Sequence, residues 1–141
     1  MTDILTGYRT YLAGQSTVTD VLGSRIDYAN TGQGSTFPRA ILTLIDSEPA
    51  RALSGNTNKV RSRIQVDVQH NQSHATAYDA LDRIRRVTDG YRGAMGSETA
   101  EHTYFESGRT GFEPSGDGSQ NHIKVASADV IIRHTQTAAS T

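Results

Sequence analysis

The sequence predicts an α+β fold, with a mostly antiparallel sheet of four to five strands, two main helices packed on it and long loops. In the stretch 60–69 (VRSRIQVDVQ), apolar β-branched residues alternate with polar ones, which is typical of a half-buried strand. In the stretch 73–88, apolar residues recur at helical spacing while most arginines and aspartates fall outside that stripe, as in an amphipathic helix. Because each element has one apolar face to bury, we expect the helix to pack back on the sheet.

Composition supports the long loops. The 141 residues are only 35% hydrophobic and include 13 glycines. We expect one domain over residues 1–134, burying about two-thirds of its unfolded surface, and a polar tail over 135–141. The absence of cysteine excludes disulfides and thiolate metal sites and fits a reducing compartment. No apolar run approaches the roughly 20 residues of a membrane span, and the start lacks the features of a signal peptide.

The N-terminal part predicts a helix that begins at Ile4, with Thr2 or Asp3 as its N-cap and Gly14 at its end. Apolar and aromatic residues recur there at helical spacing. The segments that follow are a further helical turn over 17–23, a short strand over 24–28 and a loop over 30–37.

The middle of the chain predicts two strands and the main helix. Residues 38–45 are apolar on both faces after an initial proline, which predicts a strand covered on each side. The polar segment 46–58 exceeds the usual length of a hairpin connection, so we expect a long link or an arm that orders against a partner. The helix should begin at the cap Ser73 and end near Thr88, with Gly90 in the left-handed conformation.

The C-terminal part predicts two more strands separated by flexible segments. In order we expect a small-residue linker over 94–100, a strand over 102–106, a glycine-rich loop over 107–121, a last strand over 123–133 with a bulge near Ser127, and a mobile tail from His134.

The net charge of −1 gives no strong electrostatic reason to bind nucleic acid. The charge is unevenly placed, however. Arg51, Lys59, Arg61 and Arg63 are basic with no acid among them, whereas the segment 97–118 is acidic. These regions could be solvated surfaces of opposite sign, or the basic region of one subunit could meet the acidic region of the next.

No constellation of residues predicts catalysis or a cofactor. His70 and His74 are four apart, but a turn is expected between them and no third ligand follows, so we expect surface histidines rather than zinc. The carboxylate pairs Glu98/Glu101 and Asp79/Asp82 have helical or surface spacing, with nothing to raise a pKa. No serine lies in a nucleophile elbow, and the Gly-x-Gly segments lack the context of a phosphate loop. We therefore expect a protein that is not an enzyme.

The aromatic residues do not interleave with basic residues as a base-stacking platform would. Tyr8, Tyr11 and Tyr78 are expected at the edge of the core with their hydroxyls at the surface. Arg61 and Arg63 could touch a phosphate, but pairing with Asp67 neighbours or an adjacent subunit is favoured.

A resemblance to a known family rests on residues 61–93. The residues that carry it are Arg63, Gln65, Val66, Asp67 and Val68, then Ala77, Ala80 and Leu81, and then Asp89, Gly90, Tyr91, Arg92 and Gly93. This stretch resembles the centre of the tail-completion or tail-terminator family of tailed bacteriophages. A weaker similarity covers 24–26 with the strand after Pro38, and 128–130.

The resemblance implies a structural virion protein. Members of that family form a hexameric ring that ends the tail tube at its head-proximal end and joins it to the head connector. The implied partners are identical copies, the tail tube protein and the connector or stopper protein, with DNA passing through the lumen without specific binding and with no membrane. The implied location is the virion, after assembly in the host cytoplasm.

The candidate contact residues combine the charged segments with the expected loops. They are Arg51, Lys59, Arg61, Arg63, Gln65, Asp67, Arg109, Glu113 and Asp117. Two alternatives stay open: a head-side neck protein such as a stopper or adaptor, and a small α+β ligand-binding module or enzyme that completes its pocket at a dimer interface.

Overall fold

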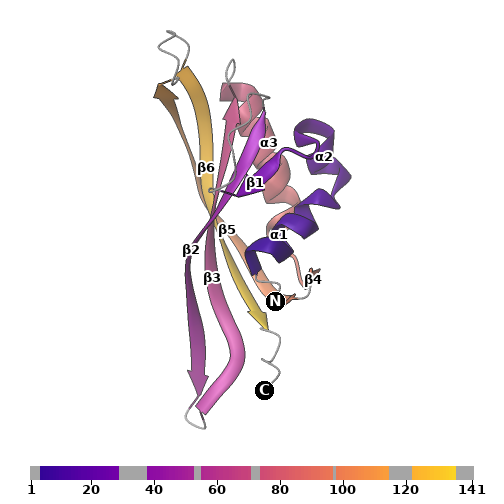
Figure 1. Cartoon of the computed structure of the whole chain (residues 1–141), viewed down its shortest axis with the longest axis vertical. Helices are drawn as coiled ribbons and strands as arrows, with labels where there is room; N and C mark the ends of the chain where they lie inside the picture. Colours follow the sequence, from indigo (N-terminus) through magenta and orange to yellow (C-terminus); the bar gives the residue numbers. More distant parts are fainter. Residues whose placement is uncertain are drawn as a thin grey trace.

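One sheet with three helices on one of its faces makes up the architecture (Figure 1). It is seen in a computed structural model that describes residues 4–28, 38–52, 55–70, 74–96, 98–114 and 122–135. The helices are α1 (Ile4–Ala13), α2 (Ser16–Leu22) and α3 (His74–Thr88). The strands are β1 (Ile26–Tyr28), β2 (Arg39–Ala52), β3 (Gly55–His70), β4 (Gly93–Met95), β5 (Glu98–Pro114) and β6 (His122–Thr135).

The described sheet has six strands in the order β1-β2-β3-β6-β5-β4, and it curls. Only the β1–β2 pair is parallel. The α+β class and the mostly antiparallel sheet are therefore confirmed. The sheet has six described strands, whereas we expected four to five. The additional strand is β4, in the segment 94–100 that we expected to be a linker, because it pairs with the start of β5.

The central strand β3 has the alternation that its sequence predicts. The residues that face the helices are fully buried: Ser62, Ile64, Val66 and Val68. The residues that alternate with them are only partly buried: Arg61, Arg63, Gln65 and Asp67. The next residue in this second set, Gln69, is buried as well. On the same side, β6 contributes alternating buried residues opposite these positions. The core lies between this face and the apolar sides of α1, α2 and α3.

Helix α3 ends where the sequence places its stop. Thr88 is its last residue, and Gly90 has φ 81°, in the left-handed region that glycine adopts freely. The Gly90 amide donates to the Thr103 carbonyl over 2.8 Å, and Asp89 accepts from the Phe105 amide over 3.1 Å. The end of α3 is thereby fixed to β5. The expected caps at Thr2, Asp3 and Ser73, and the expected loop over 30–37, lie outside the described residues.

Two long hairpins replace the loops that we expected. β2 and β3 stay paired as far as Ala52 and Gly55, and β5 and β6 as far as Pro114 and His122. Residues 46–52 and 55–58 of the expected link and residues 107–114 of the expected loop are therefore in strands, and β6 continues through His134 to Thr135. The hairpins project toward opposite ends of the molecule (Figure 1).

The reason for this error is physical. Beyond Lys59 the β2–β3 hairpin is a two-stranded ribbon. Such a ribbon has no face to bury outside the helix layer, so its sequence need not alternate between apolar and polar residues. Its backbone hydrogen bonds continue regardless. The expected bulge is also displaced: the extra residue lies in β5 between Glu106 and Arg109, opposite the segment of β6 that includes Ser127.

Strand β2 is not covered on both sides, contrary to its sequence pattern. Ala40 and Leu42 are fully buried, but Leu44 and Ile45 are 37% and 47% exposed. The helices cover only one face of the sheet and only part of its length, which leaves these apolar residues in solvent. Among the described helices, none is long and apolar enough to cross a bilayer.

Helix α1 lies close to β4 and α3. The Tyr8 side chain is fully buried and its hydroxyl lies 2.8 Å from the Thr88 hydroxyl, while the Tyr11 hydroxyl donates to the Val87 carbonyl. Burial raises the pKa of Tyr8. Our expectation of a surface hydroxyl is wrong for Tyr8, because its partner on α3 lies inside the core.

We predict that Gly7→Ala destabilises the protein by about 1–3 kcal/mol, the usual cost of overpacking. A Cβ at Gly7 would lie 2.2 Å from the Met95 carbonyl oxygen, so α1 and β4 would have to separate. Urea unfolding followed by circular dichroism measures this. Gly14→Ala is the matched control, since its Cβ would meet nothing closer than 3.5 Å. Equal unfolding midpoints for the two variants would contradict the close packing of α1 on β4.

Candidate interaction surface

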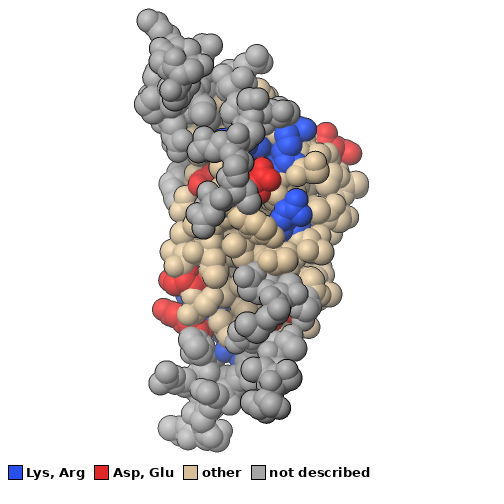
Figure 2. Space-filling view, in the orientation of Figure 1, with Lys and Arg blue, Asp and Glu red and all other residues tan. Residues whose placement is uncertain are grey.

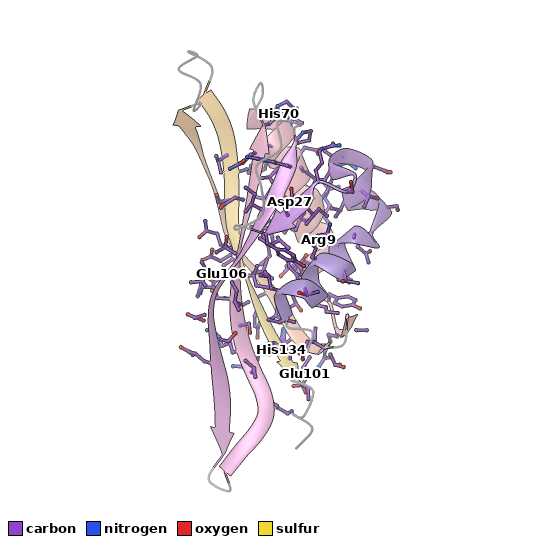
Figure 3. The ribbon with its side chains drawn as sticks, in the orientation of Figure 1. Arg9, Asp27, His70, Glu101, Glu106 and His134 are labelled. Carbon is purple, nitrogen blue, oxygen red and sulfur yellow. The ribbon has the colours of Figure 1, made fainter. Side chains whose placement is uncertain are left out.

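The face of the sheet opposite the helices carries most of the described residues that we selected as candidate contacts. We call it the open face. Directly paired residues of neighbouring strands point to the same face, so the register defines it. On β3 it presents Lys59, Arg61, Arg63, Gln65 and Asp67, which alternate with the buried residues. In Figure 3, Glu106 of β5 lies on this helix-free side of the ribbon.

Arg63 is the centre of the strongest ion-pair network on the open face. Its Nη1 atom donates to Glu106 Oε2 over 2.9 Å and to Asp129 Oδ2 over 2.7 Å. These hydrogen bonds raise the pKa of Arg63. The side chains are only partly buried, so the network contributes modestly to stability. It holds β3, β6 and β5 in register from their solvent side.

Polar contacts continue on both sides of this network. Gln65 Nε2 donates to Asp67 over 3.0 Å, and Ser127 Oγ donates to Asp67 over 2.5 Å. Lys59 lies 3.3 Å from Glu101. The favoured pairing of Arg63 is thus found within the chain, with Glu106 and Asp129 rather than with neighbours of Asp67.

The structure does not bring all candidate residues together. Arg51 lies on the β2–β3 hairpin, and Arg109 and Glu113 lie on the β5–β6 hairpin, at opposite ends of the sheet; their side chains and the whole of Asp117 lie outside what is described. Sequence reasoning also missed several residues of this face, among them Asp46, Glu48, His102, Glu106, Asp129 and Arg133. The residues on β5 and β6 follow the alternation of their strands, which indicates that they share one face. Only the pairing of the strands shows which face of the sheet that is.

A chain of polar side chains, buried except at Ser47, crosses four strands on the helix side. Ser47 of β2 and Ser62 of β3 have hydroxyls 2.9 Å apart, Ser62 lies 2.8 Å from His134 Nε2, and His134 Nδ1 lies 3.5 Å from Glu98 Oε2. The side chains of His134 and Glu98 are each 3% exposed. Our expectation of surface positions for both is therefore wrong, since β6 and β5 extend far enough to bury them.

Ser62, His134 and Glu98 are the residue types of a hydrolytic triad. Ser62 has no exposed surface, however, so it cannot attack a substrate in this conformation. These side chains instead link neighbouring strands near the start of the β2–β3 hairpin, although His134 Nδ1 and Glu98 Oε2 are buried without a hydrogen-bond partner among the described residues. Together they join β2, β3, β6 and β5 where the helix layer ends.

The remaining candidate chemistry is sparse in the described residues. No group of three or more His, Asp or Glu side chains there could hold a metal ion, and His70 and His74 lie at the end of β3 and the start of α3. His102 and Tyr104 stack on the open face with ring centroids 4.1 Å apart. Tyr104 is 41% exposed.

Comparison with known proteins identifies the fold rather than a family. No family model matches the sequence, and no curated protein matches it. The fold is similar to a chain in a solved structure described as the virion of a native gene transfer agent particle, with a TM-score of 0.72 and 12% sequence identity. The match covers 93% of this chain and 92% of that one, so the whole architecture is shared.

We predict that stability falls as the pH drops below 6.5 because of His134. Burial lowers the pKa of His134 from its ordinary 6.5, against the opposing effect of the Glu98 carboxylate. Below that pH the unfolded chain binds a proton that the folded chain does not, so the free energy of unfolding decreases toward the folded pKa. Urea unfolding between pH 7.5 and 5 should show this slope in the wild type and a reduced slope in His134→Gln. Parallel pH profiles for the two proteins would refute it.

Proposed function

We propose that this chain is a structural component of a phage-like virion, and specifically a tail-terminator subunit. In this proposal six copies form a ring that ends the tail tube and joins it to the head connector. The observation that carries the proposal is the fold, which is similar over nearly the full length of both chains to a chain of a gene transfer agent virion. The resemblance of residues 61–93 to tail-terminator proteins supports the finer assignment.

The shape of the subunit suits assembly. The β2–β3 and β5–β6 hairpins extend beyond the helix layer at opposite ends (Figure 1). A ring requires two different surfaces of one subunit to fit each other. Hairpins at opposite ends of the sheet provide two such surfaces, and Arg51, Arg109 and Glu113 lie on them.

The partners in this proposal are other copies of the chain, the tail tube protein and the connector or stopper protein. In this proposal DNA passes through the lumen without specific binding. The net charge of −1 fits this, because a strongly basic surface would attract the DNA. A stopper or adaptor on the head side of the neck is the alternative within the same class of virion component, and a ligand-binding module or enzyme is the alternative from another class.

We predict that the purified protein forms an annulus with six times the 15.3 kDa mass of the chain. Light scattering after size exclusion gives the mass, and negative-stain microscopy gives the shape. A variant lacking residues 51–56 at the end of the β2–β3 hairpin should remain folded, because Arg51, Ala52, Gly55 and Asn56 pair only with one another among the described strands, and should lose the ring. A protein that stays monomeric with purified tail tubes, or a ring indifferent to trimming both hairpins, would contradict the assignment.

A further inference from the structure

A short hairpin at one end of the sheet is firmly held at its base. We call it the β4–β5 corner: it consists of Gly93–Met95 of β4 and Glu98–Ala100 of β5, which pair with each other. At its base the Arg92 side chain donates to the Glu101 carbonyl over 3.0 Å. The Glu101 carboxylate accepts from the Thr135 hydroxyl over 2.7 Å, which ties the base to β6.

The backbone can bend where the corner leaves this base. On one side, Gly93 has φ 147°, in the region that favours glycine. On the other side, the register of β5 shifts between Ala100 and His102, so Glu101 is an extra residue that interrupts the ladder with β6. Among the described strands, β4 pairs only with β5. The corner can therefore move without breaking the rest of the sheet.

The underside of the corner is buried against β6. Met95 has no exposed surface, and Ala100 is directly opposite His134. Figure 2 shows Lys, Arg, Asp and Glu side chains at the surface, whereas the side chains of Glu98 and His134 are each only 3% exposed. In Figure 3, His134 and Glu101 lie near the lower edge of the helix layer. The corner thus covers a titratable side chain at the margin of the core.

The contact between the corner and His134 contains no hydrogen bond. His134 Nδ1 and Glu98 Oε2 are 3.5 Å apart, and both atoms are buried without a hydrogen-bond partner among the described residues. The other ring nitrogen, Nε2, lies 2.8 Å from the Ser62 hydroxyl of β3. The ring is therefore hydrogen-bonded to the sheet but not to the corner that covers it.

Few charges act on His134. The carboxylates of Glu98 and Glu101, both on β5, favour its protonation, but the effect of burial is larger and lowers its pKa. From β3 it faces the uncharged Val60 and Ser62. The described residues of β4 are glycine, alanine and methionine, which do not titrate.

The ionisable groups of the nearby helices are engaged elsewhere. On α1, which packs on the corner, the Tyr8 hydroxyl contacts Thr88 and Arg9 donates to the Ile26 carbonyl. On α3 the ion pairs join its own residues: Asp79 with Arg83, and Asp82 with Arg85 and Arg86. Lys59 of β3 pairs with Glu101.

We propose that the β4–β5 corner is a proton-controlled latch, which swings away from β6 about its base when His134 takes up a proton, while the rest of the sheet stays folded. A charged imidazole that is buried without a hydrogen bond at Nδ1 is costly, and water relieves that cost. Lifting the corner admits water by breaking only the short ladder that joins residues 99 and 100 to β6. The latch does not rest on the proposed function.

Amide hydrogen exchange, followed residue by residue by NMR, tests the latch. Opening lets His134 bind one proton, so below pH 6.5 the opening constant rises by up to about tenfold per pH unit. Protection of residues 98–100, corrected for the intrinsic exchange rate, should fall about fivefold from pH 7 to pH 5.5. A local opening should also be insensitive to low concentrations of urea, unlike the exchange of residues 62–68 of β3.

Two histidine variants separate the latch from general acid effects. In His134→Gln the protection of residues 98–100 should no longer depend on pH. In the matched control His102→Gln, which alters an exposed histidine of the same strand, the fivefold change should remain. Circular dichroism checks that both are folded. If His134→Gln does not fold, the ring protons of His134 in the wild type still decide, because a folded pKa above 6.5 would overturn the latch.

Glu98→Gln distinguishes release from clamping. If the imidazolium instead bound Glu98 and held the corner down, wild-type protection would rise in acid and Glu98→Gln would abolish the rise, which overturns the proposal. In the latch, Glu98→Gln still opens in acid, because the carboxylate opposes release rather than causing it. Corner amides that exchange with the same protection and urea dependence as β3 would also overturn it, since opening would then be global.

Discussion

One-sided burial of the sheet is the constraint on which the rest of this structure depends. The helices lie on a single face, and the residues of β3 and β6 that point to them are apolar or small. Removing such a surface from water is the main favourable contribution to folding. Because the helix layer is shorter than the strands, the same sheet has a covered middle and uncovered ends.

The polar contacts are distributed according to this constraint. On the covered side, the hydroxyls of Tyr8 and Thr88 are hydrogen-bonded inside the core, and Ser62 contacts His134 at the edge of the core. Buried polar groups need such partners. On the open side, the ion pairs of Arg63 tie three strands together in solvent. The helix side therefore holds the apolar core, while charges of the open side pair with one another across the strands.

This division fits the assembly role proposed above. Its long strands project past the core, and the projecting parts contribute surface without requiring a larger core. The similarity to a chain of a gene transfer agent virion covers 93% of this chain and 92% of that one. At 12% identity, what the two chains share is the arrangement of elements rather than particular side chains.

The sequence by itself determined the elements whose burial is periodic. The half-buried β3, the amphipathic α3 with its glycine stop at Gly90, and α1 all have a covered face, and a covered face leaves an apolar repeat that can be read along the chain. Arg63, Gln65 and Asp67 were likewise assigned correctly to the polar side of their strand.

Only the tertiary structure decided the hairpins, β4, the burial of His134 and Glu98, and the grouping of charges on the open face. Cross-strand backbone hydrogen bonds hold the hairpins without an apolar repeat, so their sequence looks like that of a loop. Whether a histidine is buried, and which of its neighbours in space are acids, depends on the register of strands that are far apart in the chain. Local periodicity carries no information about that register.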